Sequence, residues 1–165
     1  MQISSVVASA VAFLATLTSA HVEFVTPTAP SNSYSVNTIR IPHSYAGAKT
    51  INVTVDLPDG IVSVKPQQVY EWKVDFAYKN VQGTNVVSQV TWYGGNLPNE
   101  LYQDFGIELQ LSDLAVGKIL YFPVTQITVP NGTLAWNSTP DAAGKLADAA
   151  HPAPKLTVVA ASSDD

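Results

Sequence analysis

Hydrophobic and polar side chains alternate along much of the chain after residue 20. The clearest case is Ile51 to Leu57, where the two kinds take turns until Pro58-Asp59-Gly60. A period of two gives a β-strand one apolar and one polar face, so the pattern predicts a protein built from strands. Tyr34–Ile41 changes phase near Asn37, which predicts an irregularity in that strand. The other predicted strands are Val22–Val25, Ile61–Val64, Glu71–Tyr78, Val86–Tyr93, Phe105–Leu111, Ile119–Val129, Thr133–Trp136 and Lys155–Ala160.

Clusters of turn-forming residues separate these strands. Proline fixes φ and glycine accepts positive φ, so such clusters end one strand and begin the next. The predicted turns are Ala29–Ser33, Lys79–Asn85, Gly94–Pro98 and Pro130–Gly132. Short strands at this spacing favour an all-β antiparallel sandwich over alternating strands and helices. Pro140–Ala150 fits either a helical turn or a loop.

The first 20 residues differ from the rest. Residues 1–20 carry no charged side chain, have an apolar run from Val6 to Leu17, and end in the small residues Thr18 and Ala20. A run of about 12 apolar residues is too short to span a bilayer, which needs about 20. We therefore predict a signal peptide over 1–20, cleaved before His21, and a secreted mature chain that does not insert into membranes. Residues 21–160 would form one domain, and 161–165 a disordered tail.

Composition excludes several classes of function. The net charge is −5, which disfavours nucleic acid and anionic membranes as partners. The chain has no cysteine, so thiol chemistry and thiolate metal sites are excluded. The sequence shows no nucleophile elbow, catalytic triad, phosphate loop or paired carboxylates. Three glycosylation sequons, beginning at Asn52, Asn131 and Asn137, are consistent with export from a eukaryotic cell.

His21 is the residue with the most informative chemistry. Cleavage before it would leave a free α-amine beside the ring nitrogen Nδ1, and these two donors close a six-membered chelate around a metal ion. Both nitrogens lose their protons near neutral pH. Nitrogen donors of this kind favour Cu(II). The alternative is that a histidine merely happens to follow the cleavage site.

Several ordered segments together resemble the YcnI-like family of exported copper-binding domains. The resemblance begins with His21-Val22-Glu23 and Ile39–His43, and runs over nearly the whole predicted mature chain, to about Val158. Its further segments are Thr50–Pro58, Gly60–Pro66, Trp72–Val74, Val90–Pro98, Leu120–Gln126, Trp136 and His151–Leu156.

The resemblance implies an immunoglobulin-like β-sandwich that binds copper at its amino terminus through a histidine brace with one histidine. By position, it makes His21 the metal ligand and Trp136 the tryptophan near the metal. The family's carboxylate does not carry over, because Ser35 stands where some members have glutamate. Glu23 is the sequence's own candidate, since it would share a strand face with His21. Asp104 and Glu108 are weaker candidates, and Tyr45 and Thr128 replace two cysteines that many members carry.

The remaining aromatic and histidine residues have simpler interpretations. Trp72 and Trp92 lie in strand patterns and are expected in the core, while His43 and His151, each beside a proline, are expected to be surface or structural residues. The function we expect is a secreted, non-enzymatic Cu(II)-binding protein: a chaperone, buffer or delivery module. Its partners would be copper and either a membrane copper transporter or another copper protein. One alternative is a copper-dependent polysaccharide oxidase, which needs a second histidine ligand and an axial tyrosine; the chain offers only His43 or His151 as that histidine, in positions that do not resemble the oxidase family. The other is a metal-free cell-wall or adhesion module.

Overall fold

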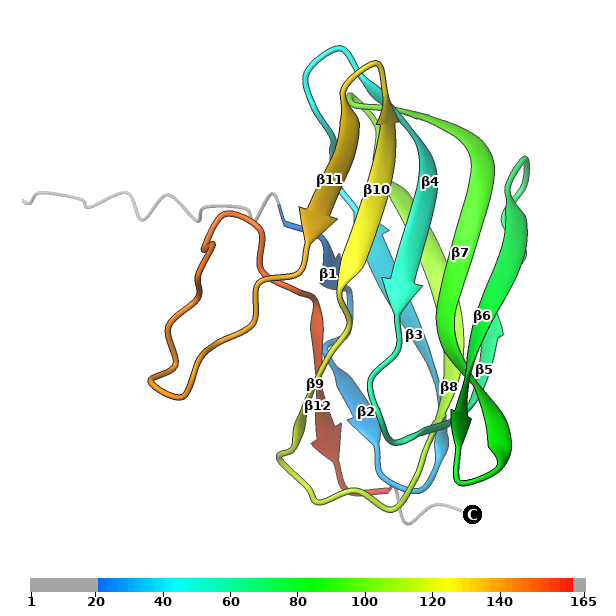
Figure 1. Ribbon diagram of the computed structural model, residues 1–165, viewed down its shortest axis with the longest axis vertical. Coiled ribbons are helices and arrows are strands. Elements are labelled where there is room, and N and C mark those ends of the chain that lie inside the picture. The colour runs from blue at the N-terminus through cyan, green and yellow to red at the C-terminus, as the bar shows by residue number, and fades with distance from the viewer. Residues whose placement is uncertain (1–20, 162–165) are drawn as a thin grey trace, which may run out of the picture.

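The computed structural model of the chain describes residues 21–161, and these form a β-sandwich (Figure 1). The predicted signal peptide and the last residues of the predicted tail lie outside the described residues. Between residues 21 and 161 there is no helix, and hence none long and apolar enough to cross a membrane. The all-β prediction is confirmed, and the choice left open at Pro140–Ala150 resolves as a loop.

Two sheets form the layers of the sandwich and a small third sheet closes one edge. The strand orders are β1-β3-β8-β5, β11-β10-β4-β7-β6 and β2-β12-β9, and every pairing is antiparallel except β2 with β12. The strands are β1 Glu23–Phe24, β2 Thr28–Pro30, β3 Tyr34–Ile41, β4 Lys49–Asp56, β5 Ile61–Pro66, β6 Lys73–Val81, β7 Thr84–Pro98, β8 Gln103–Leu111, β9 Ile119–Tyr121, β10 Val124–Val129, β11 Gly132–Trp136 and β12 Lys155–Val159.

The core lies between the two larger sheets and follows the alternation seen in the sequence. Val53 and Val55 of β4 face Ile107 and Leu109 of β8 across the sandwich interior, and all four are fully buried. Trp92 and Phe105 are among the largest core side chains, and their rings lie 5.1 Å apart. Dense packing of such side chains supplies most of the stability of a sandwich.

Four local predictions are wrong, and the turn predicted over Lys79–Asn85 is shorter than expected, because only Gln82 and Gly83 separate β6 from β7. β3 pairs with β8 without a register shift, so there is no irregularity at Asn37; this residue points inward and its Nδ2 donates to the Thr28 carbonyl. Residues 29 and 30 were expected in a turn but belong to β2. Ile119–Val129, predicted as one strand, is two strands, because the chain leaves one sheet for another at Phe122-Pro123.

The fourth error concerns the predicted turn at Gly94–Pro98, which is part of the long strand β7. Trp72 explains the second glycine, Gly95, whereas Gly94 has a positive φ of 78°. This tryptophan lies in a turn before β6, partly buried, with its ring 5.0 Å from that of Phe105. Its indole occupies the space where a side chain on Gly95 would stand, so glycine is required there without a turn.

Three parts of the chain meet at one end of the sandwich and position the candidate site. β1 lies at the edge of the four-stranded sheet, and β11 at the edge of the five-stranded sheet. The loop from 137 to 154 projects from the end of β11 and returns to β12 beside β1 (Figure 1). Its two ends are joined by a bridge between Ser138 and Pro152.

Candidate metal centre

His21 lies at the start of a short, firmly held strand. Val22 and Phe24 are 2% and 4% exposed, and the Phe24 ring packs edge-on against Phe122 at 5.0 Å. Because successive side chains of a strand point to opposite faces, burial of Val22 and Phe24 turns His21 and Glu23 outward. His21 is half-buried and Glu23 is exposed. The pairing of Glu23 and Phe24 with β3, together with the burial of Val22, therefore holds in place the backbone that follows His21.

The indole of Trp136 lies beside the His21 ring. The two ring centres are 5.9 Å apart with a 58° angle between the planes. Trp136 is the last residue of β11 and is 1% exposed, so it belongs both to the core and to the wall of the site.

A buried hydrogen-bond network holds this indole. Trp136 Nε1 donates to Gln126 Oε1 at 2.6 Å, and Gln126 Nε2 donates to the His43 carbonyl at 3.1 Å and to Thr50 Oγ1 at 2.9 Å. Gln126 and Thr50 are both fully buried. The network fixes the orientation of the Gln126 amide, and the indole N–H is engaged away from any ligand.

All three histidines of the chain contact the same indole. The ring centres of His43 and His151 lie 5.7 Å and 5.1 Å from that of Trp136. Sequence reasoning treated these two residues as surface or structural and missed their association with Trp136. The sequence held one clue: His43 and His151 both lie in segments that carry the family resemblance, Ile39–His43 and His151–Leu156.

His151 is hydrogen-bonded to Asp148, a residue that sequence reasoning did not consider. The distance from His151 Nδ1 to Asp148 Oδ2 is 2.7 Å, and the two side chains are 36% and 54% exposed. This hydrogen bond lowers the pKa of the Asp148 carboxyl. Ser138 anchors both residues: its Oγ accepts from the Asp148 N–H at 3.0 Å, and its N–H donates to the His151 carbonyl at 3.1 Å.

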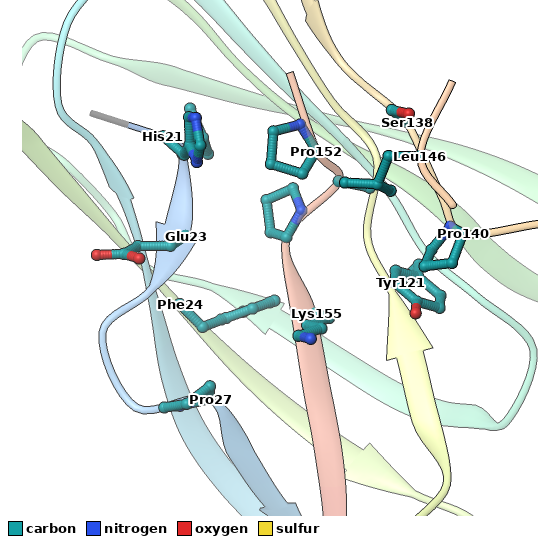
Figure 2. A pocket seen from close by; sticks show the side chains of 13 residues that line it. His21, Glu23, Phe24, Pro27, Tyr121, Ser138, Pro140, Leu146, Pro152 and Lys155 are labelled. Atoms are coloured by element: carbon teal, nitrogen blue, oxygen red, sulfur yellow. The ribbon is translucent and has the colours of Figure 1, made fainter. Parts of the chain in front are cut away.

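The carboxylates singled out in the sequence are placed apart from this cluster or are already paired. Glu23 lies opposite Arg40 in the sheet, and in Figure 2 its carboxylate points away from Pro152 and Lys155. Asp104 accepts two hydrogen bonds of 2.8 Å from Arg40, which raise the pKa of that guanidinium, and Glu108 lies 3.3 Å from Lys65.

Side chains alone do not supply a full ligand set in the described chain. Within residues 21–161, no group of three or more histidine, cysteine, aspartate or glutamate residues could hold a metal ion. A metal centre at His21 therefore depends on the backbone amine as a donor.

A cavity of about 410 Å³ opens beside His21 (Figure 2). Its walls come from β1, the end of β9 and the loop from 137 to 154, and they are mostly apolar. Among the lining residues are Tyr121, Leu146, Pro152 and Lys155.

The three sequons lie in different settings. Asn131 is exposed in the turn between β10 and β11, and Asn137 is exposed directly after β11. Asn52 is half-buried in the central strand β4, paired with Ile127 on one side and Tyr93 on the other. Glycosylation at these positions stays a prediction.

One solved structure supports the fold. An uncharacterized protein from Nocardia farcinica, described as having an immunoglobulin-like fold, is 30% identical over 85% of this chain and 99% of its own, with a TM-score of 0.69. A putative membrane anchored protein from Corynebacterium diphtheriae is 10% identical over 86% of this chain and 35% of its own, with a TM-score of 0.43. No curated protein matches the chain.

The family is settled by the sequence itself. Residues 21–158 match the family described as Domain of unknown function (DUF1775), the name under which the YcnI-like family is known. The match covers the whole sandwich, from His21 to the penultimate residue of β12. The chain is thus an immunoglobulin-like β-sandwich protein that belongs to the DUF1775, or YcnI-like, family.

Proposed function

We propose that this protein is exported, is processed to begin at His21, and binds one Cu(II) ion through the α-amine and ring Nδ1 of that residue. The observation that carries the proposal is the placement of His21: it directly precedes the buried Val22 and the strand β1, and its ring rests beside Trp136. A chelate on a fixed backbone loses little conformational entropy when the ion binds.

The chemistry of the surroundings supports a nitrogen site for Cu(II). Imidazole and amine nitrogens suit Cu(II), which stands at the top of the divalent affinity order. The Trp136 N–H is committed to Gln126, so the indole would present its ring to the bound ion and exclude water from one side. The cavity on the other side would admit further ligands.

A binding role without turnover fits this arrangement best. Such a module would hold copper outside the cell as a chaperone, buffer or delivery protein, and exchange it with a membrane copper transporter or another copper protein. Glu23 would be the carboxylate nearest to the chelate along the chain, two residues after His21. The exposed side of the site leaves a route for exchange of the ion with a partner.

The test compares two forms of the same domain. One begins at His21, as verified by mass spectrometry, and the other keeps Ala20 ahead of it. Retaining Ala20 converts the amine into an amide and removes one donor, so Cu(II) affinity should fall steeply while thermal stability in the absence of metal is unchanged. A third form, with the extra alanine at the carboxyl end instead, is the matched control. Equal Cu(II) affinity in the first two forms would refute the proposal.

One observation keeps the oxidase as a second candidate. Tyr121 lines the cavity beside His21, and His151 contacts the same indole, so a tyrosine and a second imidazole lie near the proposed site. An oxidase loaded with copper should release oxidised sugars from polysaccharide in the presence of a reductant. A binding module should release none under the same conditions.

A further inference from the structure

We propose that His151, oriented by Asp148, is a third nitrogen donor to the copper ion held by His21. The inference rests on the function proposed above and changes the predicted ligand set from one histidine to two. The copper site would then have three nitrogen ligands from two residues. Such a site does not require a cluster of three metal-binding side chains.

The first argument is proximity. The rings of His21 and His151 each lie within 6 Å of the centre of the same Trp136 indole. Pro152, the neighbour of His151, lines the cavity next to His21 (Figure 2). These contacts place the two histidines, which are 130 positions apart in the sequence, around one indole.

The second argument is the Asp148–His151 pair. A histidine that binds metal usually gives its other ring N–H to a carboxylate or carbonyl, which fixes the tautomer and the orientation of the ring. His151 has this arrangement: Nδ1 lies 2.7 Å from Asp148, so Nε2 is the nitrogen left to act as a donor. The carboxylate also places a negative charge near the ion without occupying a ligand position.

The third argument is how the backbone is held. Two hydrogen bonds join His151 and its loop to Ser138 at the end of β11: the Ser138 N–H donates to the His151 carbonyl, and the Ala153 N–H donates to the Ser138 carbonyl. The His151 side chain remains 36% exposed. An ion shared with His21 would therefore meet a ring on an anchored backbone, with nitrogen–metal distances of about 2 Å.

His43 is the natural comparison, because its ring lies at a similar distance from the same indole. Its Nδ1 lies 3.0 Å from the carbonyl of Ser44, and its own carbonyl accepts from Gln126, so it belongs to the buried network behind Trp136. The His151 side chain, by contrast, is 36% exposed and has a carboxylate partner in Asp148. The geometry therefore favours His151 over His43 as the additional donor.

The experiment counts nitrogens by electron paramagnetic resonance of the one-to-one Cu(II) complex of the domain that begins at His21. The parent and His43→Ala should show superhyperfine coupling to three nitrogens, and His151→Ala to two. Imidazole labelled with ¹⁵N, added to His151→Ala, should restore a third coupling with the pattern of the labelled nucleus. Asp148→Ala should lower Cu(II) affinity by about 10- to 100-fold, the usual effect of removing such a supporting group.

The possible failures are distinguishable. If the parent spectrum shows coupling to only two nitrogens and His151→Ala shows the same, His151 is not a ligand, but the His21 chelate stands. Loss of the third nitrogen in His43→Ala in place of His151→Ala would overturn it as well. A parent that forms no Cu(II) complex would overturn both the function and the inference. Circular dichroism of each variant, recorded without metal, shows whether the sandwich is folded.

Discussion

Replacing Gln126 with leucine tests whether the buried network behind Trp136 is as important as its geometry indicates. Leucine has nearly the same volume, so the main loss is of hydrogen bonds, those to Trp136 Nε1, Thr50 Oγ1 and the His43 carbonyl. A buried polar group left without a partner costs about 1–3 kcal/mol. Two of these groups belong to Trp136 and Thr50, which have almost no exposed surface. The leucine side chain offsets part of this cost because it adds buried apolar surface. We therefore expect the free energy of unfolding to fall by about 2–4 kcal/mol.

The assay is urea denaturation followed by far-UV circular dichroism, because tryptophan fluorescence would itself respond to the change at Trp136. The midpoint should fall while the slope with urea stays constant, as expected for a two-state domain that keeps its fold. The matched control is Gln89→Leu, in which a glutamine at the surface loses a hydrogen bond to Asp56. That change should cost less than about 0.5 kcal/mol.

A double-mutant cycle makes the test specific to the pair. Trp136→Phe removes the indole N–H, so adding it to Gln126→Leu leaves no unpaired indole donor. The double variant should be more stable than the sum of the single changes predicts, by about 1–2 kcal/mol, within the range seen for groups in contact. Additive effects, or a loss below about 0.5 kcal/mol for Gln126→Leu alone, would refute the reasoning.

Three further predictions follow from the same contacts. Glu23→Gln should weaken Cu(II) binding if this carboxylate is a ligand, whereas Asp104→Asn, at a carboxylate already paired with Arg40, should leave it unchanged in the same titration. Trp136→Phe should show clearly less fluorescence quenching by Cu(II) than the parent, because the ring beside His21 is the one removed. Gly95→Ala should lower stability by about 1–3 kcal/mol in thermal denaturation, because the new methyl group overlaps the Trp72 indole.

The sandwich was predictable because burial follows the period of the sequence. In β4 and β8 the alternation in the sequence is also the alternation of buried and exposed faces. Prediction from the sequence failed where one residue type has two structural explanations. Gly94-Gly95 reads as a turn in the sequence, but in the structure it lies inside β7, with Gly95 under Trp72.

The candidate site was predictable only in part, because its contacts are made by side chains far apart in the sequence. His21 was singled out by the chemistry of an exposed amino terminus, and Trp136 by the family resemblance. The pair of Asp148 and His151 was missed because no strand pattern covers that loop. Its position beside Trp136 results from bonds to Ser138 that no periodicity reveals.

The donors near His21 also predict which oxidation state of copper the site prefers. The chain has no cysteine and its single methionine is Met1, in the predicted signal peptide, so residues 21–161 contain no sulfur ligand. Cu(I) is a soft ion that favours thiolate and thioether sulfur, whereas amine and imidazole nitrogens suit Cu(II). Reduction of the bound ion should therefore weaken binding, and ascorbate should transfer copper from the domain to a Cu(I)-specific chelator within the time of a titration. A control with the chelator but no reductant should leave the copper on the protein. If the reduced ion stays bound against the chelator, the nitrogen chelate at His21 is not the site that holds it.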